Sequence, residues 1–189
     1  MEAIEYQITF IAFFIGLGIA DLFSSLIRLL KRRDVIEWHP LPLVWAVVAF
    51  LGLIVAWFAY YGIAENPESA SGAGFMLAIS PAIFIFAFTV SILPHEIPAE
   101  GLSLHAYYLK QRKLIFILFT LDMLARIITW RMFMPVVDPT STITFLIILI
   151  ILNLLILGLV FTKKLWYHWL VAFIMLLFYF LNVLSQSLV

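Results

Sequence analysis

The chain has 189 residues, of which 65% are hydrophobic and only 12% are charged. A soluble globular domain is about half apolar and about a quarter charged, so this composition predicts an integral membrane protein. The 11 basic and 11 acidic residues cancel, and nothing in this balance indicates a nucleic-acid partner. Because the chain has no cysteine, disulfides, thiolate metal sites and thiol nucleophiles are excluded.

Six stretches of the chain are long and apolar enough to cross a membrane, which takes about 20 apolar residues as a helix. In chain order they are Ile8–Leu30, Leu41–Ile63, Phe75–Leu93, Leu114–Met134, Ile143–Phe161 and Leu165–Leu184. The connections between them are too short for a separate domain. The predicted fold is therefore all-α: a polytopic integral membrane protein with six transmembrane helices, forming one helical-bundle domain over residues 1–189.

The charged residues separate by side of this six-span arrangement. The basic residues of one side are Arg28, Lys31, Arg32, Arg33, Lys110, Arg112, Lys113, Lys163 and Lys164. The opposite side has Glu2, Glu5, Glu65, Glu68 and Asp138. Lys and Arg concentrate in cytoplasmic loops, so the basic side is predicted to be cytoplasmic and both termini extracytoplasmic. The compact chain favours a bacterial inner membrane.

The first span carries polar residues on one face. Gly18, Asp21, Ser25 and Arg28 are spaced by three, four and three positions, which places them together on a helix. Such a stripe has to face a neighbouring helix or a water-filled cavity rather than lipid. Gly16 and Gly18 would let another helix approach closely.

The segment that precedes the fourth span has two interpretations. Between Ser103 and Lys113, the chain has Leu104, Tyr107 and Tyr108 on one side and Lys110, Arg112 and Lys113 on the other. This pattern fits an interfacial turn that leads into the span. It fits equally a cytoplasmic extension of the same helix, with the tyrosines as anchors at the lipid headgroups.

The fourth span has a polar stripe of its own, formed by Asp122, Arg126 and Thr129. At about 1.5 Å per residue, Asp122 lies roughly 12 Å from the cytoplasmic start of its span, and Asp21 roughly 13–14 Å from the cytoplasmic end of its own. Asn153 of the fifth span also falls near the midplane. The sequence therefore predicts one cluster of Asp21, Asp122, Arg126 and Asn153.

A charged side chain at the centre of a membrane helix costs about 2.5–3.5 kcal/mol on insertion scales, so these charges need partners. Arg126 neutralises one carboxylate, and the second needs a proton or a cation. Three interpretations remain open: an ion or proton path, a salt bridge that only orients helices, and a face that pairs with another subunit. The residues predicted for the path are Asp21, Asp122, Arg126, Ser25, Arg28 and Asn153.

Four histidines fall near predicted helix ends on the cytoplasmic side: His39, His95, His105 and His168. Together with Glu37, Glu96 and Glu100 they are candidate ligands of a divalent metal, or a pH-sensitive entrance, because imidazole binds several metals and titrates near neutrality. The alternative is four separate histidines. His95-Glu96 lacks the second histidine of the helical metalloprotease motif, since position 99 is Ala99.

The preferred function from sequence is a small transporter or channel-like protein that handles a proton or cation through the intramembrane Asp/Arg cluster. The first alternative is a non-catalytic assembly or sensor subunit whose polar stripe packs helices or subunits. The second is a membrane-embedded metal enzyme that uses the cytoplasmic His and Glu residues. The partners expected are the lipid bilayer and, because six short helices enclose little volume, a second copy of the chain or another membrane subunit. No cofactor is indicated.

Overall fold

The computed structural model describes residues 3–133 and 138–185. Six α-helices account for nearly all of them, which confirms the all-α prediction. They are α1 (Ala3–Lys31), α2 (Pro40–Ala64), α3 (Gly72–Ile92), α4 (Leu104–Phe133), α5 (Pro139–Phe161) and α6 (Leu165–Ser185). The short elements are the 3-10 helices η1 (Arg33–Val35) and η2 (Pro67–Ala70), and the strands β1 (Ile36–Glu37) and β2 (Leu102–Ser103).

Five of the helices, α1, α2, α3, α5 and α6, are long and apolar enough to cross a membrane. They match five of the six predicted spans. The sixth predicted span lies in α4, except for Met134, which lies outside the described residues. α4 is longer than the other helices but more polar, because Asp122, Arg126 and Arg131 fall within its apolar part.

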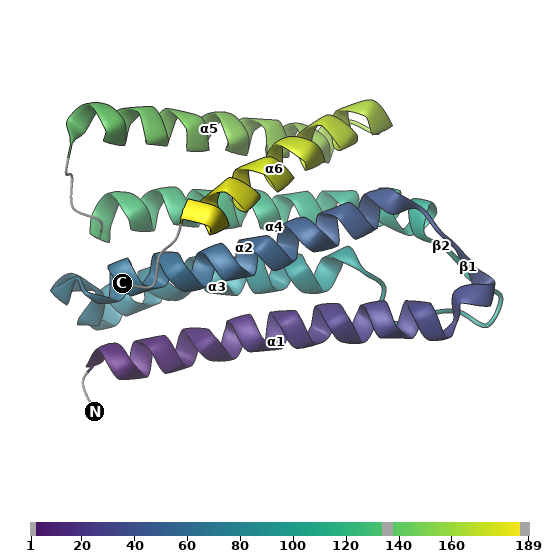
Figure 1. Cartoon of the computed structure of the whole chain (residues 1–189), viewed down its shortest axis with the longest axis horizontal. Coiled ribbons are helices and arrows are strands. Elements are labelled where there is room, and N and C mark those ends of the chain that lie inside the picture. Colours follow the sequence, from purple (N-terminus) through teal and green to yellow (C-terminus); the bar gives the residue numbers. More distant parts are fainter. Residues whose placement is uncertain (1–2, 134–137, 186–189) are drawn as a thin grey trace.

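The helices run roughly parallel to the long axis of the molecule, and α2 and α3 lie between α1 and α4 (Figure 1). α1 packs on α2 and α3, α4 packs on α3 and α5, and α2 packs on α6. The start of α1 and the end of α6 lie at the same end of the bundle (Figure 1). The loops after α1, α3 and α5 lie at the opposite end.

Helix starts coincide with capping signals in the sequence. α2 begins with Pro40 at its first position, and Nδ1 of His39 accepts a hydrogen bond from the backbone N–H of Leu41. α5 begins in the same way at Pro139, preceded by Asp138, whose carboxylate accepts hydrogen bonds from two backbone N–H groups of the first turn. These hydrogen bonds satisfy donors that have no partner within the helix.

A two-residue parallel pairing ties together the loops at the end where α1 finishes. Ile36 of β1 pairs with Leu102 of β2, and Glu37 pairs with Ser103. Gly101, immediately before β2, has a φ of 103°, a conformation that favours glycine. The pairing holds the loop before α2 beside the loop before α4, so His39 and His105 come close together.

α4 begins at Leu104, which confirms the helical extension before the fourth predicted span. The tyrosines of this extension do not both face the headgroups, because Tyr108 is fully buried. Gly18 of α1 makes the predicted close approach, since a β-carbon there would lie 3.1 Å from Cδ1 of Leu53. Gly16 does not, because a β-carbon there would meet nothing within 4 Å.

Candidate functional site

A buried ion pair lies on one face of α4. Nε of Arg126 donates a hydrogen bond to Oδ2 of Asp122 over 2.9 Å, one helical turn apart. The Asp122 side chain is completely buried, and the Arg126 side chain is 13% exposed. Such a pair is weak evidence for stability, because the free-energy cost of removing two charges from water can exceed the energy of their attraction. A functional role is therefore the hypothesis to test for an ion pair buried inside this bundle.

The hydrogen bonds around the pair are incomplete. Nη2 of Arg126 donates to the backbone carbonyl of Gly52 in α2 over 3.4 Å. Oδ1 of Asp122 is buried and has no hydrogen-bond partner among the described residues. Thr129, the third member of the predicted stripe, donates its hydroxyl to the carbonyls of Ala125 and Arg126 within its own helix. The Thr129 hydroxyl therefore does not donate a hydrogen bond to Asp122.

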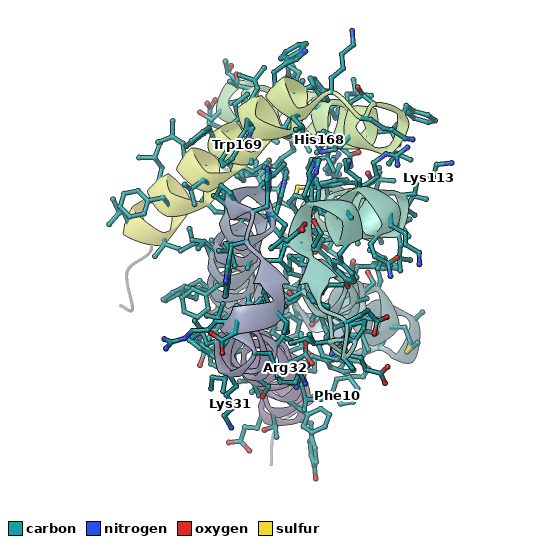
Figure 2. All side chains as sticks on the ribbon, turned by 90° about the vertical axis from the view of Figure 1, so that its right-hand side faces the viewer. Phe10, Lys31, Arg32, Lys113, His168 and Trp169 are labelled. Carbon is teal, nitrogen blue, oxygen red and sulfur yellow. The ribbon has the colours of Figure 1, made fainter. Side chains whose placement is uncertain are left out.

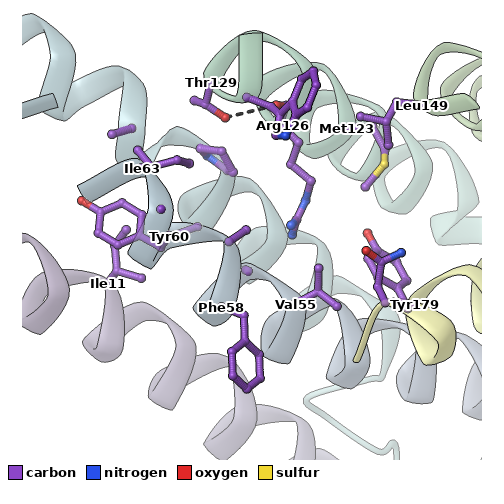
Figure 3. A pocket seen from close by; sticks show the side chains of 18 of the residues that line it. Ile11, Val55, Phe58, Tyr60, Ile63, Met123, Arg126, Thr129, Leu149 and Tyr179 are labelled. Carbon is purple, nitrogen blue, oxygen red and sulfur yellow. Dashed lines mark hydrogen bonds between the residues drawn. The ribbon is translucent and has the colours of Figure 1, made fainter. Parts of the chain in front are cut away.

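Arg126 separates the buried Asp122 from a cavity of about 310 Å³. Its guanidinium extends from α4 into this cavity, toward the side where α2 passes (Figure 3). Asp122 is not part of the cavity wall. The other lining residues are mostly apolar, and they include Val55, Phe58, Ile63, Met123, Trp130, Phe145, Leu149 and Phe178.

Tyr179 of α6 also lines the cavity, and its hydroxyl is buried without a hydrogen-bond partner among the described residues. Its ring lies against Gly52, the residue whose carbonyl accepts from Arg126, since a β-carbon at Gly52 would be 3.5 Å from Cζ of Tyr179. The cavity therefore has polar groups from α4 and α6 on a mostly apolar wall.

Asn153 lies close to the pair along α4 but does not contact it. The side-chain amide of Asn153 donates to the backbone carbonyl of Thr120 over 3.2 Å, and both residues are buried. Asn153 thus joins α5 to α4, two positions before Asp122 in the chain.

Asp21 belongs to a different group of residues, at the other side of the bundle. Its Oδ1 lies 3.5 Å from Nδ1 of His95, in the loop after α3. Arg28 donates to the hydroxyl of Ser25 over 2.7 Å, and its Nη2 lies 3.3 Å from the same His95 nitrogen. Among the described residues, neither a hydrogen bond nor an ion pair joins Asp21 to Asp122.

The predicted single cluster is therefore two groups. Depth along the membrane normal placed Asp21 and Asp122 at one level, but α2 and α3 lie between α1 and α4 (Figure 1). Equal depth on two helices does not make the helices neighbours. Of the six residues predicted for the path, the structure brings together Asp122 with Arg126, and separately Asp21 with Ser25 and Arg28 through His95.

His95 links Arg28 and Asp21 in a way that depends on its protonation. Nε2 of His95 lies 2.9 Å from the carbonyl of Val90, which only accepts, so Nε2 carries a proton. Nδ1 then accepts from Arg28 when the ring is neutral. If Nδ1 also takes a proton, it donates to Asp21 and repels Arg28.

The four histidines lie in three places. The rings of His39 and His105 lie with centroids 4.8 Å apart and are tilted by 31° to each other. His95 is in the Asp21 group, and His168 is buried in α6, where its Nδ1 lies 2.6 Å from the hydroxyl of Tyr108. Among residues 3–133 and 138–185, no three His, Asp or Glu side chains are arranged to hold a metal ion. The predicted four-histidine site is therefore not assembled, because the fold keeps the His39–His105 pair, His95 and His168 apart.

His39 has an environment that disfavours its charged form. Partial burial, and in second place the neighbouring His105, lowers the pKa of His39 below 6.5. Protonation at Nδ1 would also remove the acceptor that caps α2.

Gly52 and Tyr179 lie at the site but were not predicted from the sequence to belong to it. A glycine inside an apolar helix and a tyrosine inside another are both visible as unusual positions, since a buried tyrosine hydroxyl ordinarily finds a partner. The local sequence pattern does not show which helices face one another, so neither residue could be predicted to lie near Arg126.

No family model, no curated protein and no solved structure matches this chain. The interpretation of the site therefore depends on its geometry alone.

Proposed function

We propose that this protein is a small membrane transporter in which the Asp122–Arg126 pair handles a proton beside a substrate chamber. The observation that carries the proposal is the position of Arg126, which contacts the buried carboxylate on one side and lines the 310 Å³ cavity on the other. Intramembrane carboxylates frequently mark proton and ion routes. A salt bridge that only orients helices would not need a cavity beside its arginine.

The geometry favours a proton over a metal cation. The group that faces the cavity is the cationic guanidinium of Arg126, and Asp122 lies behind it. A metal ion in the cavity would therefore meet a positive charge first. A proton reaches Asp122 without needing a coordination shell, and Oδ1 of Asp122 is buried without a hydrogen-bond partner in the described part of the chain.

We propose further that α4 crosses the membrane as the fourth of six spans. Its ion pair is satisfied inside the bundle, which lowers the cost of placing these two charges in lipid. The basic residues Lys31, Arg32 and Lys113 lie at one end of the bundle, the end that faces the viewer in Figure 2. By the positive-inside rule this end is cytoplasmic and both termini are extracytoplasmic, in a membrane of the bacterial inner-membrane type.

Because the chain has no cysteine, single introduced cysteines test this topology directly. E68C and K31C lie at exposed positions near opposite ends of the bundle. A membrane-impermeant thiol reagent added to intact cells should label E68C and leave K31C unlabelled until the membrane is permeabilised. Labelling of both, or of K31C alone, would contradict the proposed orientation.

In this proposal the Asp21 group serves the cytoplasmic side. Asp21, Arg28 and His95 are partly exposed and lie at the end of α1 and α3 that carries the basic loops. Their charges attract ions to that end.

Reconstitution into liposomes tests the transport function. With a pH-sensitive dye inside, the protein should move protons faster than protein-free vesicles do when a pH gradient, a membrane potential or a gradient of small organic ions is imposed. D122N should abolish this flux. D138N is the matched control, because Asp138 is an exposed helix cap whose role asparagine also fills. Absence of flux above protein-free vesicles under all of these gradients would reject the transport function.

The same variant separates transport from assembly. Both charges of the pair find their partner within one chain, so the pair does not require a second subunit. An assembly role instead predicts that D122N changes the oligomeric state in mild detergent, and size-exclusion chromatography with light scattering measures this.

A further inference from the structure

We propose that the cavity binds a small amphipathic monocarboxylate, with its carboxylate on Arg126, its apolar body against the aromatic wall, and one proton bound at the same time. This inference rests on the proposed function, because it names the substrate class of the same chamber.

The cavity offers hydrogen-bond donors that have no acceptor. Of the guanidinium nitrogens of Arg126, Nε donates to Asp122 and Nη2 donates to Gly52. Within the described residues, Nη1 donates no hydrogen bond. The hydroxyl of Tyr179 is buried without a hydrogen-bond partner among the same residues. Leaving this buried hydroxyl unpaired is unfavourable, so the site favours a ligand that brings acceptor atoms.

The charge and shape of Arg126 select a carboxylate among such acceptors. A guanidinium presents its donors in a planar fork that matches the two oxygens of a carboxylate, and hydrogen bonds to a charged acceptor are roughly twice as strong as neutral ones. A ligand cation would be repelled by the same group. A phosphate dianion would bring two charges to a wall with only one cation.

The rest of the cavity selects an apolar body. Trp130 of α4, Phe145 of α5 and Phe178 of α6 line it together with aliphatic side chains from α2 and α3. The volume of about 310 Å³ equals about ten water-sized volumes of about 30 Å³ each, which corresponds to a body of roughly ten heavy atoms. An aromatic acid of this size, such as phenylacetate, matches both the wall and the volume.

Charge balance couples the ligand to a proton. With the ligand in place, two carboxylates, its own and that of Asp122, share the single guanidinium of Arg126, which leaves one net negative charge among mostly apolar side chains. One proton from solution, bound to either carboxylate, restores neutrality, and no covalent bond forms or breaks. The cost of burying an unpaired charge makes this proton uptake part of binding.

Isothermal titration calorimetry of the purified full chain in detergent tests the ligand class. Phenylacetate should bind, phenylacetamide should bind at least about tenfold more weakly, and phenethylamine should not bind. R126Q should lose phenylacetate binding. R131Q is the matched control, since Arg131 is exposed on the same helix and does not line the cavity.

Two further variants keep the test valid if R126Q does not fold. D122N/R126Q removes both charges together, so no buried carboxylate remains unpaired, and it should also lose binding. A59F adds a ring to a cavity-lining residue while it leaves the ion pair in place, and it should compete with the apolar body. No measurable phenylacetate binding to the native chain, equal binding of phenylacetamide, or native affinity in the D122N/R126Q or A59F variant would overturn the proposal.

Proton uptake separates this inference from the transport function. Phenylacetate titrations at pH 7 in phosphate and in Tris, whose ionisation enthalpies differ, should show uptake of one proton per ligand bound. Binding without proton uptake would overturn the proposal. Binding with one proton, but without proton or phenylacetate flux in liposomes, would support the ligand class and reject transport.

Discussion

Tyr108 and His168 are joined by a buried hydrogen bond of 2.6 Å, which holds the start of α4 against the start of α6. Nε2 of His168 lies 3.0 Å from the carbonyl of Thr162, so Nε2 carries the proton and Nδ1 accepts from the tyrosine. One interpretation of the sequence made Tyr108 an anchor at the headgroups, and one made His168 a metal ligand. In the structure, each side chain is the hydrogen-bond partner of the other.

Y108F should therefore destabilise the protein, because it leaves Nδ1 of His168 buried without a donor. The expected loss is about 1–3 kcal/mol, measured as thermal or denaturant unfolding in detergent. Y107F is the control, since Tyr107 is only half-buried and donates to the carbonyl of Ser91 over a longer 3.3 Å. A loss in Y107F as large as in Y108F would contradict the assigned role.

Stability should fall as the pH is lowered through the range in which His39 titrates. The pKa of His39 in the folded state is lowered below 6.5, so the unfolded chain binds the proton first as the pH falls. The contribution of His39 is complete above pH 6.5 and is lost progressively toward its folded pKa. H39N retains a capping residue for α2 and removes the titration, so unfolding measured between pH 8 and 5 should show a smaller slope in this variant. An unchanged slope would exclude His39 as the source.

G158A should loosen the contact between α5 and α6. A β-carbon at Gly158 would overlap the hydroxyl of Tyr167, which donates to the carbonyl of Leu155 over 2.8 Å. Displacing the ring breaks this hydrogen bond, and the expected cost is about 1 kcal/mol. In a Y167F background the added cost of G158A should be smaller, because the overlapping atom is gone. G16A is the neutral control, since nothing lies within 4 Å of the added carbon.

Loss of the carboxylate should be far more costly at Asp122 than at Asp21. D122N leaves the Arg126 charge almost fully buried without its anion, for an expected loss of about 3–5 kcal/mol. D21N removes a carboxylate beside His95, in a contact whose side chains are 25% and 52% exposed, and about 0–1 kcal/mol is expected for it.

The effects of D21N and D122N should also add in the double variant, because the two residues share no partner. Equilibrium unfolding in detergent of the two single variants and the double variant measures both points. A coupling well above about 0.5 kcal/mol would favour the single cluster that the sequence predicts.

Hydrophobicity and helix punctuation determined most of the fold without tertiary information. Runs of about 20 apolar residues have one low-energy form in lipid, since every backbone group must be paired internally. Five predicted spans therefore coincide with apolar helices, and the spacing of four residues correctly joined Asp122 to Arg126 on one helix. Both properties depend on residues close together in the chain, so the sequence alone predicts them.

Which helices are neighbours was decided only by the tertiary structure. Helix packing depends on the complementary shapes of whole surfaces, so the sequence could not reveal that α2 and α3 separate Asp21 from Asp122, or that Gly52 and Tyr179 lie at Arg126. The cavity beside Arg126 is likewise formed by residues of all six helices together. The sequence by itself determined that a charged pair is buried in an apolar bundle. The packing of the helices decided that the pair borders a chamber and that its second carboxylate is elsewhere.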